Sequence, residues 1–239
     1  MTQSDTARTG FLHEVRNIAT TVAIPHHEPP AVVLRRRIVV AIVVVIGAVL
    51  LGYSLNRRPG EGSFYWLTFA LAAVWTVGAF ASGPLHLGSV CFRGRNQRPV
   101  ITGTTVGLVL GGIFVAGGLI ARQIPAVSEY IRGVLDFADK GTLELVVLIT
   151  LINGVAEELF FRGALYTALG RHVPTVISTI LYVAAIAATG NPMLVFAAVI
   201  LGSVCAFERR MTGGVLAPIL THVFWGLIVV LALPPVFGY

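Results

Sequence analysis

Two adjacent carboxylates and one guanidinium stand inside an otherwise apolar stretch of this chain. Residues 154–163 read GVAEELFFRG and carry Glu157, Glu158 and Arg162. Placing an ionisable side chain inside a bilayer costs about 2.5–3.5 kcal/mol on insertion scales, so each of these residues is expected to have a structural or functional role. On a helix Glu158 and Arg162 share a face and can form an ion pair, whereas Glu157 points about 100° away from Glu158. The spacing therefore predicts a Glu158–Arg162 ion pair and an unpaired, desolvated Glu157, which is a candidate general base.

A histidine lies on a later apolar segment at a matching depth. At about 1.5 Å per helical residue, Glu157 lies roughly 18 Å and His222 roughly 12 Å from the same end of their spans, which is level within the boundary error. A carboxylate and an imidazole at one depth can hold and deprotonate a water molecule for attack on a carbonyl. Two other interpretations stay open: the ionisable groups lock helices together, or they mark an ion pathway.

The elements that position these side chains are predicted to be membrane helices. Of the 239 residues 56% are apolar and only 12% are charged, with a mean hydropathy of +0.84. A soluble domain carries about a quarter charged residues, so an ordinary water-soluble enzyme is excluded. We expect an all-α polytopic transmembrane bundle of about 7–8 membrane helices. The apolar segments span about 38–55, 64–82, 103–121, 142–169, 174–189, 192–207 and 214–233.

The first 37 residues are polar and form a predicted cytoplasmic tail, followed by a transmembrane domain over 38–239. Apolar residues recur at helical spacing in the tail, which is compatible with a short helix on the membrane surface and equally with a disordered tail. A further amphipathic piece over 123–138 predicts a re-entrant or surface helix. Lys and Arg are more numerous on the segments that share a side with the N-terminus, which predicts a cytoplasmic N-terminus.

These features predict a multi-pass integral membrane protein, which we expect in a bacterial cell membrane with lipid around it. The net charge of +6 would suggest nucleic acid in a soluble protein, but the basic residues sit at membrane edges, so no nucleic-acid partner is expected. Cys91 and Cys205 are far apart and indicate neither a disulfide framework nor a cysteine zinc site.

Glycines at intervals of four mark one face of the third apolar segment. Gly103, Gly107 and Gly111 expose backbone on that face, a pattern typical of close helix packing in membranes. The pattern predicts packing within the chain, with a homodimer seam through the same glycines as the alternative.

The motif E-E-x-x-x-R-G, with a histidine on a later span, is similar to that of the CAAX-prenyl-protease and bacteriocin-processing family of intramembrane proteases. The resemblance covers about 145–232, within a protease-like core at about 142–233. It implies an intramembrane endopeptidase acting near the cytoplasmic side on a peptide or protein, prenylated in part of the family. By this resemblance Glu157 matches the water-activating glutamate, Glu158 and Arg162 complete the first motif, and His222 opens the third.

Two positions depart from the family pattern. The second motif, F-x-x-x-H, aligns with Tyr182 to Ile186, and the third motif has Gly226 where the family has Asn or Asp. Isoleucine cannot bind water, transfer a proton or ligate a metal. Tyr182 lies one turn from Ile186, and its hydroxyl could orient water or stabilise an oxyanion, which adds it to the candidate site.

A metal site is poorly supported by the residues present. The family is often described as metalloproteases, and a divalent metal such as zinc normally takes three protein ligands, of which Glu157 and His222 supply two. Two alternatives to proteolysis remain: a catalytically degenerate scaffold or immunity-type protein of the same fold, and a small proton-coupled transporter.

Overall fold

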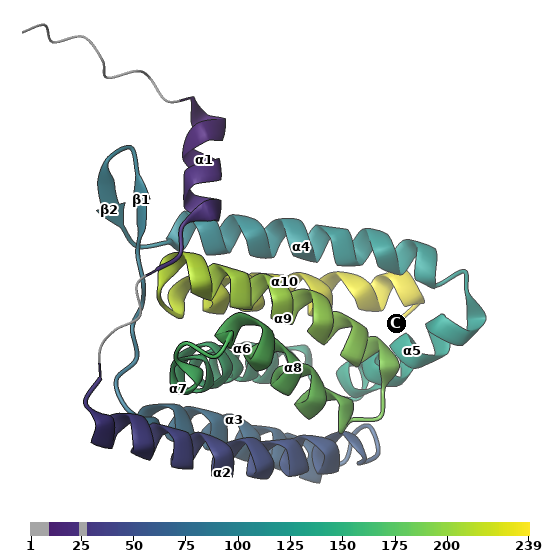
Figure 1. Ribbon diagram of the computed structural model, residues 1–239. Coiled ribbons are helices and arrows are strands. Elements are labelled where there is room, and N and C mark those ends of the chain that lie inside the picture. The colour runs from purple at the N-terminus through teal and green to yellow at the C-terminus, as the bar shows by residue number, and fades with distance from the viewer. Residues whose placement is uncertain (1–9, 24–27) are drawn as a thin grey trace, which may run out of the picture.

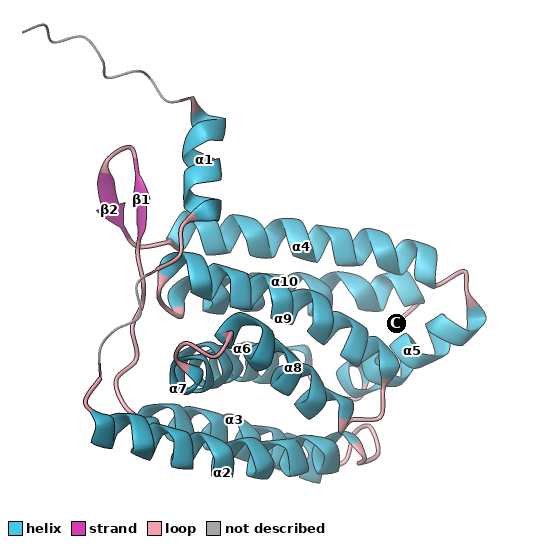
Figure 2. Cartoon of the chain, in the orientation of Figure 1, coloured by secondary structure: helices cyan, strands magenta, loops and turns pink. Residues whose placement is uncertain are grey.

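The computed structural model describes residues 10–23 and 28–239, and the chain there is almost entirely helical (Figures 1 and 2). The parts of the predicted tail over 1–9 and 24–27 lie outside the described residues. The elements in order are α1 Phe11–Thr20, α2 Pro30–Leu55, α3 Gly62–Ser82, β1 Val90–Phe92, β2 Arg95–Gln97, α4 Val100–Ala121, α5 Pro125–Asp139, α6 Leu143–Glu158, the π-helical turn η1 Leu159–Leu165, α7 Tyr166–Leu169, α8 Pro174–Ala187, α9 Pro192–Thr212 and α10 Leu216–Phe237.

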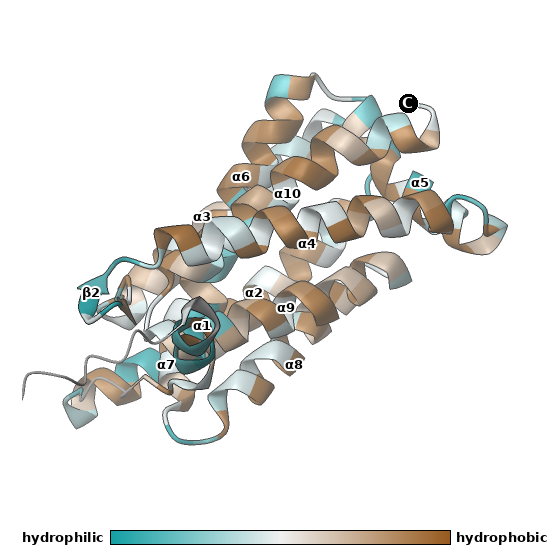
Figure 3. Cartoon of the chain, turned by 90° about the horizontal axis from the view of Figure 1, so that it is seen from above, coloured by the Kyte–Doolittle hydropathy of each residue, from teal (hydrophilic) through white to brown (hydrophobic). Residues whose placement is uncertain are grey.

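The all-α membrane prediction is confirmed, and the chain is a multi-pass integral membrane protein. Five of the described helices are long and apolar enough to cross a membrane, namely α2, α3, α4, α9 and α10, and α8 is a shorter apolar helix. Large apolar side chains are exposed along these helices, and hydrophilic residues lie mainly at the helix ends and in the loops (Figure 3). Helices α1 and α5 occupy the two stretches expected to be amphipathic.

Three details differ from the expected segments. The fourth segment is not one regular helix, because the π-helical turn η1 separates α6 from α7. The loop after α3 contains the small antiparallel hairpin β1–β2, which apolar periodicity did not indicate. Helix α9 continues to Thr212 rather than ending near 207, so that Glu208 and Arg209 belong to the helix.

The helices that carry the candidate site pack in the middle of the bundle. Helices α2 and α3 lie on one side, α4 and α10 on the other, and α6, η1, α8 and α9 between them (Figure 1). Trp75 of α3 contacts the rings of Phe160 and Phe161 in η1, at centroid distances of 4.6 and 5.0 Å. This aromatic cluster anchors the π-helical turn against α3.

The glycine face of α4 packs against α10 of the same chain. A β-carbon at Gly103 would lie 2.5 Å from the Ala217 carbonyl oxygen, and one at Gly107 would lie 2.7 Å from the Thr221 carbonyl oxygen. Gly111 faces Ile228 at a similarly short distance. The predicted internal packing is present. Helix α10 of the same chain therefore covers the face that the alternative, a homodimer seam through these glycines, would use.

A buried arginine joins the start of α2 to the end of α3. Arg36 is fully buried and binds the Glu28 carboxylate, the Ser82 hydroxyl at 3.0 Å and the Pro84 carbonyl at 3.0 Å. The sequence predicts only that Arg36 is one of the basic residues at a membrane edge. The contacts instead tie the segment before α2 to the loop that leads to the hairpin.

Candidate active site

Glu157 and Glu158 occupy the last turn of α6, and Arg162 lies in the π-helical turn η1 that follows. Thr142 is the N-cap of α6, and its hydroxyl accepts a hydrogen bond from the Leu145 backbone N–H. A π-helical turn widens the backbone by one residue and frequently occurs at functional sites. Here it places a guanidinium at the centre of the bundle, among α6, α8, α9 and α10.

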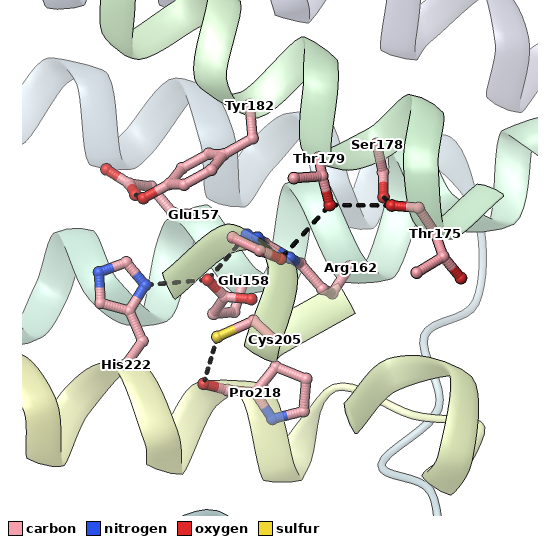
Figure 4. A network of polar contacts seen from close by, with 11 residues as sticks. Glu157, Glu158, Arg162, Thr175, Ser178, Thr179, Tyr182, Cys205, Pro218 and His222 are labelled. Carbon is pink, nitrogen blue, oxygen red and sulfur yellow. Dashed lines mark hydrogen bonds and ion pairs between the residues drawn. The ribbon is translucent and has the colours of Figure 1, made fainter. Parts of the chain in front are cut away.

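The predicted Glu158–Arg162 ion pair is present and fully buried (Figure 4). Arg162 Nη1 donates to Glu158 Oε1 at 2.9 Å, and its Nη2 donates to the Gly202 carbonyl of α9, also at 2.9 Å. The same Glu158 oxygen contacts His222 Nδ1 at 2.9 Å. The Glu158 carboxylate of α6 therefore connects η1 with α10, and Arg162 extends the network to α9.

Glu157 is separate from this ion pair, but it is not unpartnered as expected. The Tyr182 hydroxyl of α8 donates to Glu157 Oε2 at 3.0 Å, and the Tyr182 ring lies 4.6 Å from the Arg162 guanidinium carbon. This contact changes two expectations. Glu157 has a hydrogen-bond partner, and the Tyr182 hydroxyl donates its hydrogen to that carboxylate rather than to a water molecule. Among the described residues, Glu157 Oε1 accepts no hydrogen bond.

His222 lies close to both carboxylates, with Glu158 as its direct partner. Because a carboxylate oxygen accepts, Nδ1 carries the hydrogen, and in a neutral imidazole Nε2 is then the acceptor. The imidazole packs on α6 at Gly154, where a β-carbon would lie 3.2 Å from His222 Cδ2. His222 and Glu157 interact electrostatically, and they are 8% and 9% exposed. Glu158 thus orients the imidazole, and the meeting of Glu157 and His222 around one water molecule stays a prediction.

The two departures from the family motifs remain apolar in the structure. Ile186 packs against the main apolar core cluster. A β-carbon at Gly226 would lie 3.1 Å from the Thr150 methyl of α6. These positions therefore add no polar group to the candidate site.

The donor set does not fit a divalent metal. Within residues 10–23 and 28–239, no group of three or more His, Cys, Asp or Glu side chains could hold a metal ion. Glu158 Oε1, the carboxylate oxygen in contact with His222 and so a candidate metal ligand beside it, already binds Arg162 as well. We therefore assign no chemical step to a metal.

Sequence reasoning missed several buried polar groups on α9 and α10. Glu208 is 1% exposed, and its Oε1 lies 2.9 Å from the Thr221 hydroxyl. The Thr221 hydroxyl also lies 3.0 Å from the Gly103 carbonyl oxygen of α4. Like the other basic residues, Arg209 is expected from the sequence to lie at a membrane edge, but its side chain is buried. Continuing the helical period of Gly202 and Cys205 by one turn would have shown that residues 208 and 209 return to the bundle interior.

Residues 140–228 match the family model described as type II CAAX prenyl endopeptidase Rce1-like. The match supports the predicted resemblance to the CAAX-prenyl-protease family over this stretch of the chain. The matched stretch, here called the Rce1-like region, runs from before α6 into α10 and contains every candidate site residue. The comparisons with curated proteins and with solved structures gave no match.

Proposed function

We propose that this CAAX-protease-like membrane protein is an intramembrane endopeptidase that hydrolyses a peptide bond with glutamate-activated water near the cytoplasmic side. The observation that carries the proposal is the different environment of the adjacent carboxylates. Glu158 is fully buried, including an Oε2 that has no hydrogen-bond partner in the described part of the chain, and its Oε1 binds Arg162 and His222. Glu157 has no ion pair among the described residues and is 9% exposed, and its Oε1 accepts no hydrogen bond from them. That oxygen can accept a proton from water.

In the proposed reaction, a water molecule lies between Glu157 Oε1 and His222 Nε2. Glu157 removes a proton as the water oxygen attacks the scissile carbonyl carbon, and the carbonyl π electrons move to its oxygen. When the tetrahedral intermediate collapses, the C–N bond breaks and the protonated Glu157 gives its proton to the leaving amine. Glu158 holds the His222 tautomer in place, as the orienting acid does in a catalytic triad.

A second candidate is a catalytically inactive scaffold of the same fold. The apolar environment of Ile186 and Gly226 favours it, because neither position can hold water or an oxyanion. Losing one oxyanion donor typically costs about 10²–10³ in rate. The buried Glu158–Arg162–His222 network would then serve packing alone.

The decisive experiment is proteolysis by the purified full-length protein in lipid nanodiscs. A peptide library, presented with and without a C-terminal farnesyl group, is analysed by mass spectrometry. We expect cleavage by the wild type and a loss of at least about 10²-fold in Glu157→Gln. Glu144→Gln is the matched control, because Glu144 is an exposed carboxylate at the start of the same helix.

The result separates the two functions. Equal cleavage by wild type and Glu157→Gln would reject Glu157 as the base. Complete absence of cleavage from both library forms, with the protein folded, would favour the scaffold. The two library forms also establish the substrate class, because a requirement for the farnesyl group appears as cleavage of one form alone.

A further inference from the structure

Arg209 is a buried cation that the proposed reaction does not use. It lies in the last turn of α9 and is 9% exposed, while its neighbour Arg210 is exposed. Among the described residues, no carboxylate forms an ion pair with Arg209. A buried charge without a counter-ion is costly unless hydrogen bonds compensate it. The contacts that stabilise this guanidinium therefore indicate its role.

Those contacts lie on the π-helical turn η1 and on α7, which follows it directly. Arg209 Nε donates to the backbone carbonyl of Arg162 at 2.8 Å, and Nη2 reaches the Thr167 hydroxyl at 3.4 Å. Thr167 in turn donates to the Gly163 carbonyl at 2.6 Å. The guanidinium carbon lies 4.9 Å from the centre of the Tyr166 ring. Arg209 thus binds one carbonyl of η1 directly and reaches the next carbonyl through the Thr167 hydroxyl.

These carbonyls belong to the π-helical turn that carries Arg162, so the contact with Arg209 can affect the candidate site. A buried carbonyl needs a hydrogen-bond partner, and a π-helical turn is rare because its geometry is less favourable than that of an α-helix. The planar fork of arginine fits adjacent acceptors better than the single ammonium of lysine. The residue held at its carbonyl, Arg162, is also the residue whose side chain binds Glu158, and Glu158 binds His222.

We propose that Arg209 is a positioning residue that holds the π-helical turn, so that Arg162 and Glu158 keep His222 in one tautomer and orientation. The connection to proteolysis rests on the proposed function, whereas the connection to His222 does not. The chain of contacts runs from α9 through η1 and α6 to α10. Trp75 of α3 and the Gly202 carbonyl of α9 also contact this part of the chain, whereas Arg162 Nε has no hydrogen-bond partner among the described residues.

The test is nitrogen NMR of the full-length protein with ¹⁵N-labelled histidine in nanodiscs, with His222→Ala used to assign the signal. In the wild type we expect one fixed tautomer with the hydrogen on Nδ1. Arg209→Gln should convert the His222 signal to a mixture of tautomers, and Arg209→Lys should restore it only in part. Arg210→Gln is the matched control and should leave the signal unchanged.

Thr167→Val provides a milder variant if Arg209→Gln does not fold. It removes only the hydroxyl between Arg209 and the Gly163 carbonyl, and we expect a smaller change of the same His222 signal. An unchanged His222 signal in a folded Arg209→Gln or Thr167→Val protein would overturn the proposal, as would an equal change in Arg210→Gln.

Activity gives an independent second measurement. If the protein is a protease, Arg209→Lys should lower kcat about tenfold to a hundredfold with little change in KM, because a displaced group costs rate more than binding. A wild type without activity, but with the expected NMR change in Arg209→Gln, would contradict the proposed function and leave the positioning role supported. A normal kcat in Arg209→Lys and Arg209→Gln would reject the catalytic consequence.

Discussion

At the residue scale, replacing the adjacent glutamates Glu157 and Glu158 is expected to affect stability to very different extents. Replacing Glu158 by Gln leaves the buried Arg162 charge without its counter-ion, and breaking a buried ion pair in this way costs about 3–5 kcal/mol. Glu157→Gln keeps an oxygen that accepts from Tyr182, so we expect little loss of stability. Thermal unfolding in detergent measures the difference. Equal unfolding temperatures for the two variants would contradict the assignment of the ion pair to Glu158.

The hydroxyl of Tyr182 gives a second prediction at this scale. Tyr182→Phe keeps the ring contacts with Arg162 and Phe161 and removes only the hydrogen bond to Glu157. One hydrogen bond contributes about 1 kcal/mol, so the fold should persist. Because Glu157 loses its positioning contact, we expect the rate of proteolysis to fall about tenfold. A Tyr182→Phe protein with unchanged proteolysis would remove Tyr182 from the candidate site.

At the element scale, the close approach of α4 and α10 depends on bare backbone at Gly107. A β-carbon there would meet the Thr221 carbonyl oxygen at 2.7 Å, and a backbone atom cannot move aside as a side chain can. We expect Gly107→Ala to destabilise the protein by about 1–3 kcal/mol. Gly112→Ala is the control on the same helix, because nothing lies within 4 Å of its β-carbon. Equal stability of both variants would contradict this packing.

The elements show which features local patterns can predict. Apolar run length located the helices, and i,i+4 spacing predicted the Glu158–Arg162 pair, because both depend on neighbouring residues. Local spacing does not reveal that Tyr182 faces Glu157 or that Arg209 reaches Arg162, because these contacts join residues 25 and 47 positions apart. The π-helical turn was also missed, since its residues are as apolar as those of a regular helix.

At the scale of the whole molecule, the charge distribution and the helix order make one prediction about orientation. Helices α2 and α3 are antiparallel neighbours, so the hairpin β1–β2 after α3 lies at the same end as α1, while α5 and the C-terminus lie at the other end (Figure 1). The hairpin and its flanks carry Arg93, Arg95 and Arg98 with no acidic residue among positions 90–98. An excess of arginine marks the cytoplasmic side. We therefore expect this end of the bundle to be cytoplasmic.

The native cysteines make this orientation measurable. Cys91 is exposed in the hairpin, whereas Cys205 is buried on α9. A membrane-impermeant maleimide should therefore label the wild type in inverted vesicles but not in intact cells, and Cys91→Ser should abolish the labelling. Arg58→Cys in the Cys91→Ser background places the thiol in the loop between α2 and α3, at the opposite end, and should reverse the pattern. Labelling of Cys91 in intact cells would invert the orientation and place the proposed proteolysis on the other side of the membrane.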